Sequence, residues 1–160
     1  MVMNLMFELK HWRAYATKNG WKAAPVLVFV MLTGGCTLLG DIVNSHYETL
    51  DAARKDHLFE RGWLPDLLPA SSVKLRTSND LDINLSEGSF HFVAADYAGF
   101  THKLDATIPR SSPYARWDRT VESYRRKKYQ SWHVSADGSH WVFFCNERRD
   151  YCEYRSWHRK

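Results

Sequence analysis

The pattern of hydrophobic and polar residues divides the chain into an apolar N-terminal run and a longer region of mixed patterns. Residues 23–32, Ala-Ala-Pro-Val-Leu-Val-Phe-Val-Met-Leu, carry no charge. After residue 45, patterns typical of helices and of strands follow one another. We therefore predict an α+β fold: a single domain with an antiparallel sheet, including a C-terminal three-stranded meander, covered on one face by two or three helices.

The first elements of the mixed region are predicted as a helix followed by a hairpin. Residues 45–61 have the capping-box spacing at Ser45 and Glu48, and Gly62 suits the position after a helix end. In residues 79–86, polar and apolar residues alternate without a break, which predicts a strand with one solvent-facing side. Glu87-Gly88 is then the expected turn, with residues 89–93 as the returning strand.

Two short helices are predicted in the middle of the chain. Tyr97, Phe100 and Leu104 have the i, i+3, i+7 spacing of an amphipathic helix. Ser112-Pro113 is a suitable helix start. The inner side of this second helix would carry four large residues: Tyr114, Trp117, Val121 and Tyr124.

The last fifty residues predict two successive hairpins. Asp137-Gly138 is the strongest short hairpin signal, and a two-residue turn there places Trp132 opposite Phe143. The same register puts Val134 opposite Trp141, on one face, and leaves His133, Ser135 and His140 on the other. A second turn at 147–150 places Cys145 opposite Cys152. Opposed residues of this kind come close enough for a disulfide, although two buried thiols are the alternative.

The N-terminal segment has the order of a secretory signal. Four basic residues precede the apolar run, and small residues and a cysteine follow it: Lys10, Arg13, Lys18 and Lys22, then Gly34, Gly35 and Cys36. An apolar core of about 10 residues is short for a membrane span, which needs about 20. A retained single-pass anchor is the alternative, and in both cases the rest of the chain lies across the membrane from the basic flank.

The stretch Leu32-Thr33-Gly34-Gly35-Cys36 resembles a bacterial lipobox, departing from the usual pattern at Thr33. The resemblance implies that Cys36 is lipidated, as with palmitate, and becomes the mature N-terminus. It implies a lipoprotein signal peptide over 1–35, a tether over 36–45 and a periplasmic domain over 46–160. Thr37 follows the cysteine, which by the same resemblance favours the outer membrane. A buried cysteine ending an apolar helix is the alternative reading of Cys36.

Charge gives little support to nucleic-acid binding. Residues 1–35 carry four basic residues and one acidic residue, so most of the net charge of +4 leaves with the signal segment. The remainder is uneven, since residues 110–160 hold 12 basic and 6 acidic side chains. No nucleic-acid partner is therefore predicted.

A second resemblance is carried by phrases in the first half of the domain. These are His46-Tyr47-Glu48-Thr49-Leu50, Leu58-Phe59-Glu60-Arg61-Gly62-Trp63-Leu64-Pro65 and Ser86-Glu87-Gly88. They resemble small bacterial lipoproteins with a YbbD-like head domain, over about residues 45–104. The resemblance implies a family placement and brings no reaction with it.

No motif predicts a catalytic residue, a metal site or a cofactor. Asp80, Asp82 and Asn84 have the opening spacing of a calcium loop, but Leu85 and His91 occupy positions that need Gly and Glu. His57 and Glu60 would supply only two ligands of a zinc site. A further group could bind a metal or carry out acid–base chemistry only if the fold brought its members together: His133, His140, His158 and Glu153.

The densest charge run is Arg125-Arg126-Lys127-Lys128, between Tyr124 and Tyr129. Basic residues with aromatics can bind anionic lipid headgroups or the phosphates and carboxylates of envelope polymers, although a solvated connection is the simpler alternative. We expect a membrane-anchored, non-enzymatic binding or assembly module whose partner is an envelope protein or anionic envelope polymer. The alternatives are an envelope hydrolase using Asp82, Glu87 and His91, or an inhibitor or immunity-type protein.

Overall fold

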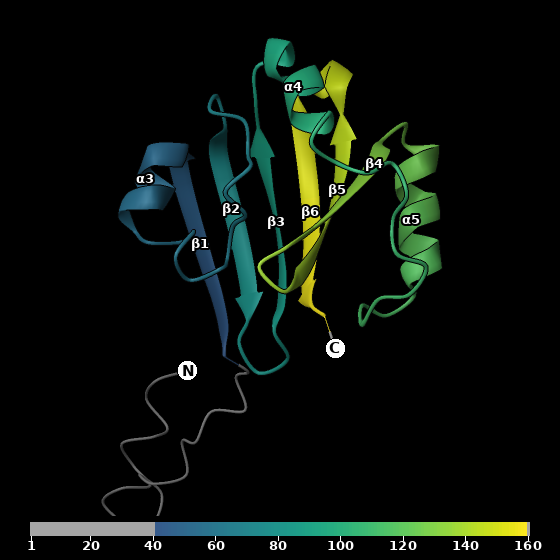
Figure 1. Ribbon diagram of the computed structural model, residues 1–160, viewed down its shortest axis with the longest axis horizontal. Helices are drawn as coiled ribbons and strands as arrows, with labels where there is room; N and C mark the ends of the chain where they lie inside the picture. The colour runs from purple at the N-terminus through teal and green to yellow at the C-terminus, as the bar shows by residue number, and fades with distance from the viewer. Residues whose placement is uncertain (1–40, 160) are drawn as a thin grey trace, which may run out of the picture. The chain divides into compact units, whose positions relative to one another are not determined.

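A computed structural model describes residues 41–159, which form a six-stranded antiparallel sheet with a few short helices (Figure 1). The strand order is β1-β2-β3-β6-β5-β4. The strands are β1 (Ile42–Thr49), β2 (Val73–Asp80), β3 (Leu85–His91), β4 (Gln130–Ala136), β5 (Ser139–Asn146) and β6 (Tyr151–His158). The helices are α3 (Leu50–Lys55), α4 (Tyr97–Thr101) and α5 (Trp117–Arg126), with short 3-10 turns η2 (Ala94–Asp96) and η3 (Glu147–Arg149). The fold is α+β and dominated by its sheet.

Several predictions lie outside the described residues. These are the signal peptide over 1–35, the lipidation site Cys36 and the first part of the tether. Residues 42–45, which we assigned to the tether, belong to β1. None of the helices within residues 41–159 is long and apolar enough to span a membrane.

The sheet consists of two sequential halves joined at its centre. β1, β2 and β3 pair in chain order, and so do β4, β5 and β6. β3 pairs with β6 along its whole length, from Leu85 opposite Trp157 to His91 opposite Tyr151. This pairing joins residues 60 to 72 positions apart in the sequence and makes one continuous sheet.

The pairs predicted in the C-terminal half are observed. Trp132 lies opposite Phe143, and Val134 lies opposite Trp141. Cys145 lies opposite Cys152, and a disulfide joins them. The hairpin turn has Asp137 and Gly138 at positive φ, 49° and 74°, as this tight turn requires.

The predicted helix over 45–61 is wrong at both ends, since only Leu50–Lys55 is helical and residues 56–61 form turns. Residues 42–49 form a strand in which Asn44 and His46 are exposed while Ser45 and Tyr47 are half-buried. The strand pairs with β2, a partner that local capping signals do not reveal. The helix begins only at Leu50, where the Thr49 hydroxyl accepts a hydrogen bond from Ala52 N (3.2 Å).

The alternating segment 79–86 is also not one strand. β2 ends at Asp80, residues 81–84 turn, and β3 begins at Leu85. The Asp80 carboxylate holds the turn by accepting hydrogen bonds from Asp82 N (3.1 Å) and Ile83 N (3.4 Å). Glu87 and Gly88, predicted as the turn, therefore lie inside β3.

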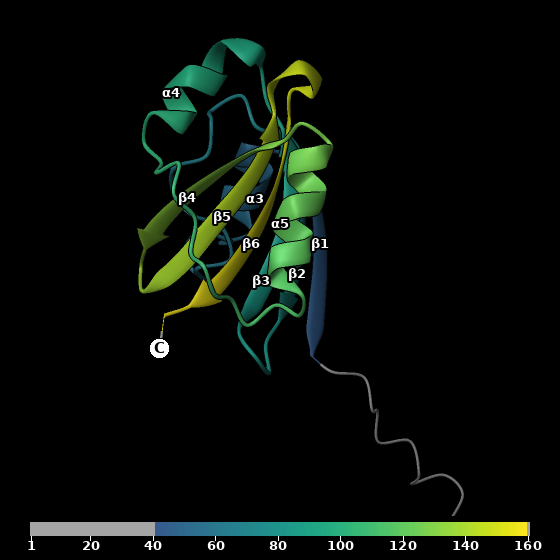
Figure 2. The ribbon, with the colours of Figure 1, turned by 90° about the vertical axis from the view of Figure 1, so that its right-hand side faces the viewer.

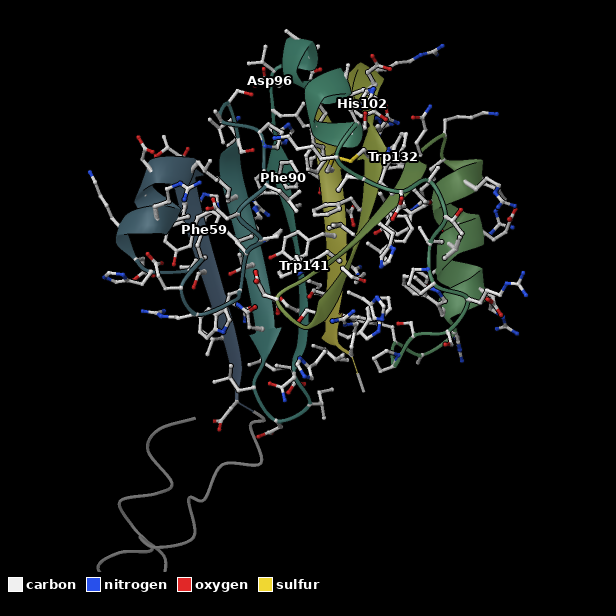
Figure 3. The ribbon with its side chains drawn as sticks, viewed as in Figure 1. Phe59, Phe90, Asp96, His102, Trp132 and Trp141 are labelled. Carbon is white, nitrogen blue, oxygen red and sulfur yellow. A yellow bond between two sulfur atoms is a disulfide. The ribbon has the colours of Figure 1, made fainter. Side chains whose placement is uncertain are left out.

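The helices do not share one face of the sheet, which corrects the predicted arrangement. On the first face, α3 and α4 pack with Phe90, Phe143 and Tyr154 in the larger core; Figure 3 shows Phe59, Phe90 and Trp141 in this layer. On the second face, α5 lies alongside the sheet (Figure 2). Its residues pack there with Phe144 and Trp157. Neighbouring residues of β5 alternate between the two cores because side chains along a strand point to opposite faces.

Candidate functional site

The predicted basic segment lies at the C-terminal end of α5 and in the turn that leads to β4. Its four basic side chains, Arg125, Arg126, Lys127 and Lys128, are exposed. The two flanking tyrosines are not: Tyr124 is 9% exposed and Tyr129 packs against the same core. The candidate surface therefore consists of its four basic residues, and the two tyrosines belong to the core.

Tyr124 holds this end of α5 on the sheet. Its ring stacks on Phe144 with centroids 4.0 Å apart and planes 8° apart. Its hydroxyl donates a hydrogen bond to the Glu153 carboxylate of β6. Burial, and then this bond to a carboxylate, raise the pKa of Tyr124, so the hydroxyl remains a donor at neutral pH. These two contacts of Tyr124 therefore hold the C-terminal end of α5, which carries the basic segment, against the sheet.

The strand register places the basic segment at one end of the sheet. Gln130 at the start of β4 lies opposite Cys145, and Cys145 lies opposite Cys152. β1 begins at the other end, where Ile42 lies opposite Asp80. We call the end that holds the disulfide the distal end.

The distal end carries two further exposed basic residues, Arg148 and Arg149 in η3. Sequence reasoning placed them in a turn but not in the candidate surface; the signal was available in the predicted register of the second hairpin. We call Arg125, Arg126, Lys127, Lys128, Arg148 and Arg149 the distal basic cluster.

Most of this cluster carries unneutralised charge. Arg125 pairs with Glu122 at 3.3 Å, and Lys127 Nζ lies 6.0 Å above the Tyr124 ring. Among residues 41–159, no acidic side chain lies within 4.0 Å of the charged groups of the other five cluster members. The cluster is therefore available to an anionic partner.

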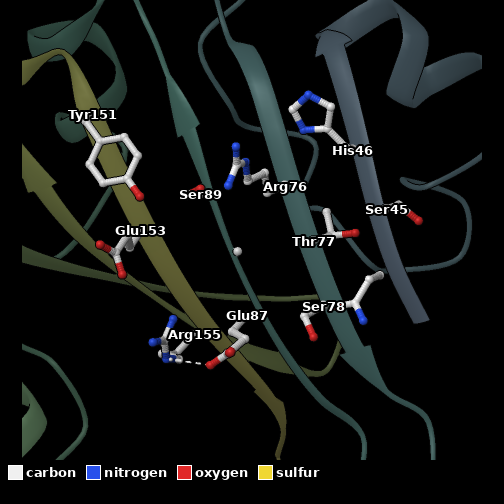
Figure 4. A pocket seen from close by; sticks show the side chains of 12 residues that line it. Ser45, His46, Arg76, Thr77, Ser78, Glu87, Ser89, Tyr151, Glu153 and Arg155 are labelled. Carbon is white, nitrogen blue, oxygen red and sulfur yellow. Dashed lines mark ion pairs between the residues drawn. The ribbon is translucent and has the colours of Figure 1, made fainter. Parts of the chain in front are cut away.

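The second face of the sheet is polar where β1, β2, β3 and β6 meet. It forms a shallow depression of about 580 Å³ (Figure 4). Charged and aromatic side chains line it: His46, Arg76, Glu87, Tyr151, Glu153 and Arg155. The carboxylates are already engaged, since Glu87 pairs with Arg155 at 3.1 Å and Glu153 accepts from Tyr124. Both carboxylates of this depression are therefore held by neighbouring side chains.

The residues proposed for a hydrolase are not brought together. Asp82 is in the β2–β3 turn, Glu87 is in the middle of β3, and His91 ends that strand beside Tyr151, with ring centroids 4.9 Å apart. Four residues of a strand span about 13 Å, so Glu87 and His91 do not share one reacting atom.

A narrower cleft of about 390 Å³ opens on the first face, near the end where β1 begins. Its walls include Trp63 and the 2% exposed Trp141, and its polar residues include Asn79, Ser86 and Ser156. Sequence reasoning missed it, because the loop after α3 and strands from both halves of the sheet form it jointly. It contains none of the three proposed hydrolase residues.

Two of the four residues considered for metal or acid–base chemistry do meet. His133 Nε2 lies 3.0 Å from His140 Nδ1, and Ser135 Oγ lies 3.2 Å from the same His140 atom. Burial is the main cause that lowers the pKa of both imidazoles. The pKa of His133 is lowered further by His140 and raised by Asp105. The pKa of His140 is lowered further by Arg159. Glu153 instead bonds Tyr124. Residues 41–159 contain no group of three or more His, Cys, Asp or Glu that could hold a metal ion.

Comparison with protein families found a match, which covers the first half of the sheet. The family model of the YbbD head domain matches residues 41–91, the segment from the start of β1 to the end of β3. This match confirms the predicted resemblance to that family. The comparisons with curated proteins and with solved structures found no match. The distal basic cluster and the disulfide lie outside the matched segment.

Proposed function

We propose that this protein is an envelope lipoprotein, anchored through lipid on Cys36, that acts as a non-enzymatic binding or assembly module. The anchor would hold it at the outer membrane, facing the periplasm. The distal basic cluster is the binding surface, and the partner presents carboxylates or phosphates. An acidic face of an envelope protein and an anionic envelope polymer both have this chemistry.

Two observations support the anchor. The order of basic residues, apolar run, small residues and cysteine in residues 10–36 is that of a lipoprotein signal. The disulfide between Cys145 and Cys152 suits an oxidising compartment, and Cys36 is the remaining one of the three cysteines in the sequence.

The observation that carries the binding role is the position of the cluster. The cluster lies at the opposite end of the sheet from Ile42, where the chain enters the domain from the side of Cys36. A domain held at its entry end presents its distal end to the periplasm. Electrostatic attraction at such an exposed surface speeds encounter with an oppositely charged partner and weakens as salt rises.

The alternatives of a hydrolase and an inhibitor make different demands. A hydrolase needs acid and base groups around one reacting atom, and Asp82, Glu87 and His91 lie apart. An inhibitor or immunity-type protein would use the same distal cluster against one enzyme, so the identity of the captured partner distinguishes it from an assembly module.

In-cell photo-crosslinking tests the binding role. A photoreactive residue at Arg126, which ends α5, should capture a partner or label an envelope polymer. Lys55 is the matched control, because it is an exposed basic residue that ends α3. Capture at position 126 should disappear when Arg125, Lys127 and Lys128 are all changed to Gln. Equal capture at 55 and 126, or capture unaffected by the Gln changes, would remove the distal cluster from the function.

A further inference from the structure

Three large apolar side chains are exposed together at the end of the sheet where β1 begins. Ile42 is 53% exposed, Leu81 is 44% exposed and Ile83 is 60% exposed. Ile42 lies opposite Asp80, and Leu81 N donates a hydrogen bond to Asp41 O at 3.1 Å. The β2–β3 turn therefore lies beside the start of β1 (Figure 1). We call Ile42, Leu81 and Ile83 the apolar tip.

Hydrogen bonds within the β2–β3 turn define the backbone that carries Leu81 and Ile83. The Asp80 carboxylate accepts hydrogen bonds from the backbone of Asp82 and Ile83, and Asn84 adopts a left-handed conformation with φ of 52°. Leu81 and Ile83 belong to neither of the two cores. Turns normally carry polar residues at such positions, so two exposed aliphatic side chains in this turn point to an apolar contact.

We propose that the apolar tip docks on the surface of the bilayer in which the lipid of Cys36 is anchored. The proposal rests on the lipid anchor proposed above. The six residues from Cys36 to Ile42 span at most about 20 Å when fully extended. An eight-residue strand is about 26 Å long, so the anchor confines the tip end, and not the distal end, to the neighbourhood of the bilayer.

The charge around the tip sets the kind of bilayer that suits it. Asp41 and Asp82, which are sequence neighbours of the three apolar residues, are exposed, and Asp80 is half-buried. These carboxylates remain in the headgroup layer, where anionic lipid would repel them. The tip thus fits a zwitterionic surface, whereas the distal basic cluster would favour an anionic one.

Docking would fix the orientation of the domain. The acyl chains provide the anchorage, and shallow insertion of aliphatic side chains adds a second point of contact. With two contacts at one end of the sheet, the domain stands on the membrane and the distal basic cluster faces the periplasm.

The test uses the full-length lipidated protein in phosphatidylcholine vesicles. Cys145 and Cys152 are bridged and Cys36 would carry lipid, so Ile83→Cys introduces the reactive thiol for an environment-sensitive fluorophore. Val93→Cys is the matched control, because Val93 is 58% exposed and lies beyond the other end of β3. The label at 83 should shift its emission to the blue and lose intensity to nitroxide-bearing lipids. The label at 93 should show neither change.

Each outcome decides between the tip and the anchor. If the protein floats with vesicles but both labels remain in water, docking is overturned while the anchor stands. If the protein does not float, and Cys36→Ser behaves like the wild type, both proposals fail. A blue shift at 83 that strengthens as phosphatidylglycerol is added, or that occurs only with other envelope proteins present, would also overturn docking on a zwitterionic bilayer.

Discussion

Tyr154 of β6 lies directly across the backbone of Gly88 in β3. A Cβ added at Gly88 would lie 2.7 Å from Tyr154 Cε1 and 2.1 Å from the backbone oxygen of Arg76. Gly88 and Tyr154 pair at the junction of the two half-sheets, and the Tyr154 side chain is fully buried there. The missing side chain at Gly88 is what allows a large aromatic ring to fill the centre of the sheet.

Gly88→Ala should therefore lower the free energy of unfolding by about 2–3 kcal/mol, because the clash with a backbone oxygen cannot be relieved by rotating a side chain. Urea unfolding measures the change. Gly99→Ala is the control: Gly99 lies in α4 with open space around its added Cβ, so stability should stay the same or rise slightly. Equal effects at both glycines would contradict the account of the junction.

Removing the disulfide should cost about 2 kcal/mol of stability, because the bridge closes a short loop in the unfolded chain. The bridged residues are seven apart in sequence and almost fully buried. The measurement is urea unfolding with and without a reductant. In the Cys145→Ala/Cys152→Ala variant the reductant should have no effect; an effect there would assign the loss to another group.

Substitutions at Tyr124 and at its basic neighbours should have different effects on the free energy of unfolding. Tyr124→Phe should cost about 1.5–3 kcal/mol of stability, because it removes the hydrogen bond that the hydroxyl of this buried tyrosine donates to a carboxylate. Arg126→Gln should change stability by less than about 0.5 kcal/mol, since the side chain is exposed and forms no ion pair with any residue of 41–159. If Arg126→Gln were as destabilising as Tyr124→Phe, the basic residue would have a structural role.

Acid should weaken the contact between β4 and β5 through the pair His133 and His140. The pKa of each is lower in the folded protein than in the unfolded chain, so below pH about 6.5 the unfolded chain takes up protons first. The pair therefore contributes its full stability above that pH, and the contribution falls as pH drops toward the folded pKa values.

The measurement is urea unfolding of the wild type and of the His133→Gln/His140→Gln variant. The pH runs from about 7.5 to about 5, a range that includes the ordinary histidine pKa. The difference in unfolding free energy between the two proteins should shrink or reverse as pH falls. A difference independent of pH would mean that the two imidazoles do not titrate with folding.

The C-terminal half of the fold was predictable because its contacts are local. Asp137-Gly138 fixes one turn, the alternation of large residues fixes the faces, and the cysteines fix the second register. Each strand there pairs with the next one in the chain.

The N-terminal half was not predictable from the same signals because its decisive contacts are distant. Ser45 and Glu48 have capping-box spacing, yet β1 gains more by pairing with β2, which begins at Val73. Asp80, Asp82 and Asn84 alternate with apolar residues as in a strand, but the Asp80 carboxylate closes a turn instead. This mistake moved the turn and with it the position of Glu87.

The candidate surface was predictable only as a run of charge. Two predictions include Tyr124: one places it on the inner side of α5 and the other in the binding surface. Its packing on Phe144 shows that it lies on the inner side. Arg148 and Arg149 lie outside that run, and they join the surface through the register of the second hairpin, which the sequence does predict. The apolar tip required the corrected turn.

The central claim is that the domain works while anchored through lipid on Cys36, and metabolic labelling with a clickable fatty acid tests it most directly. Wild-type protein should incorporate the label, and Cys36→Ser should not, while the Cys145→Ala/Cys152→Ala variant should be labelled like the wild type. Equal labelling of wild type and Cys36→Ser, or no labelling of either, would contradict the account.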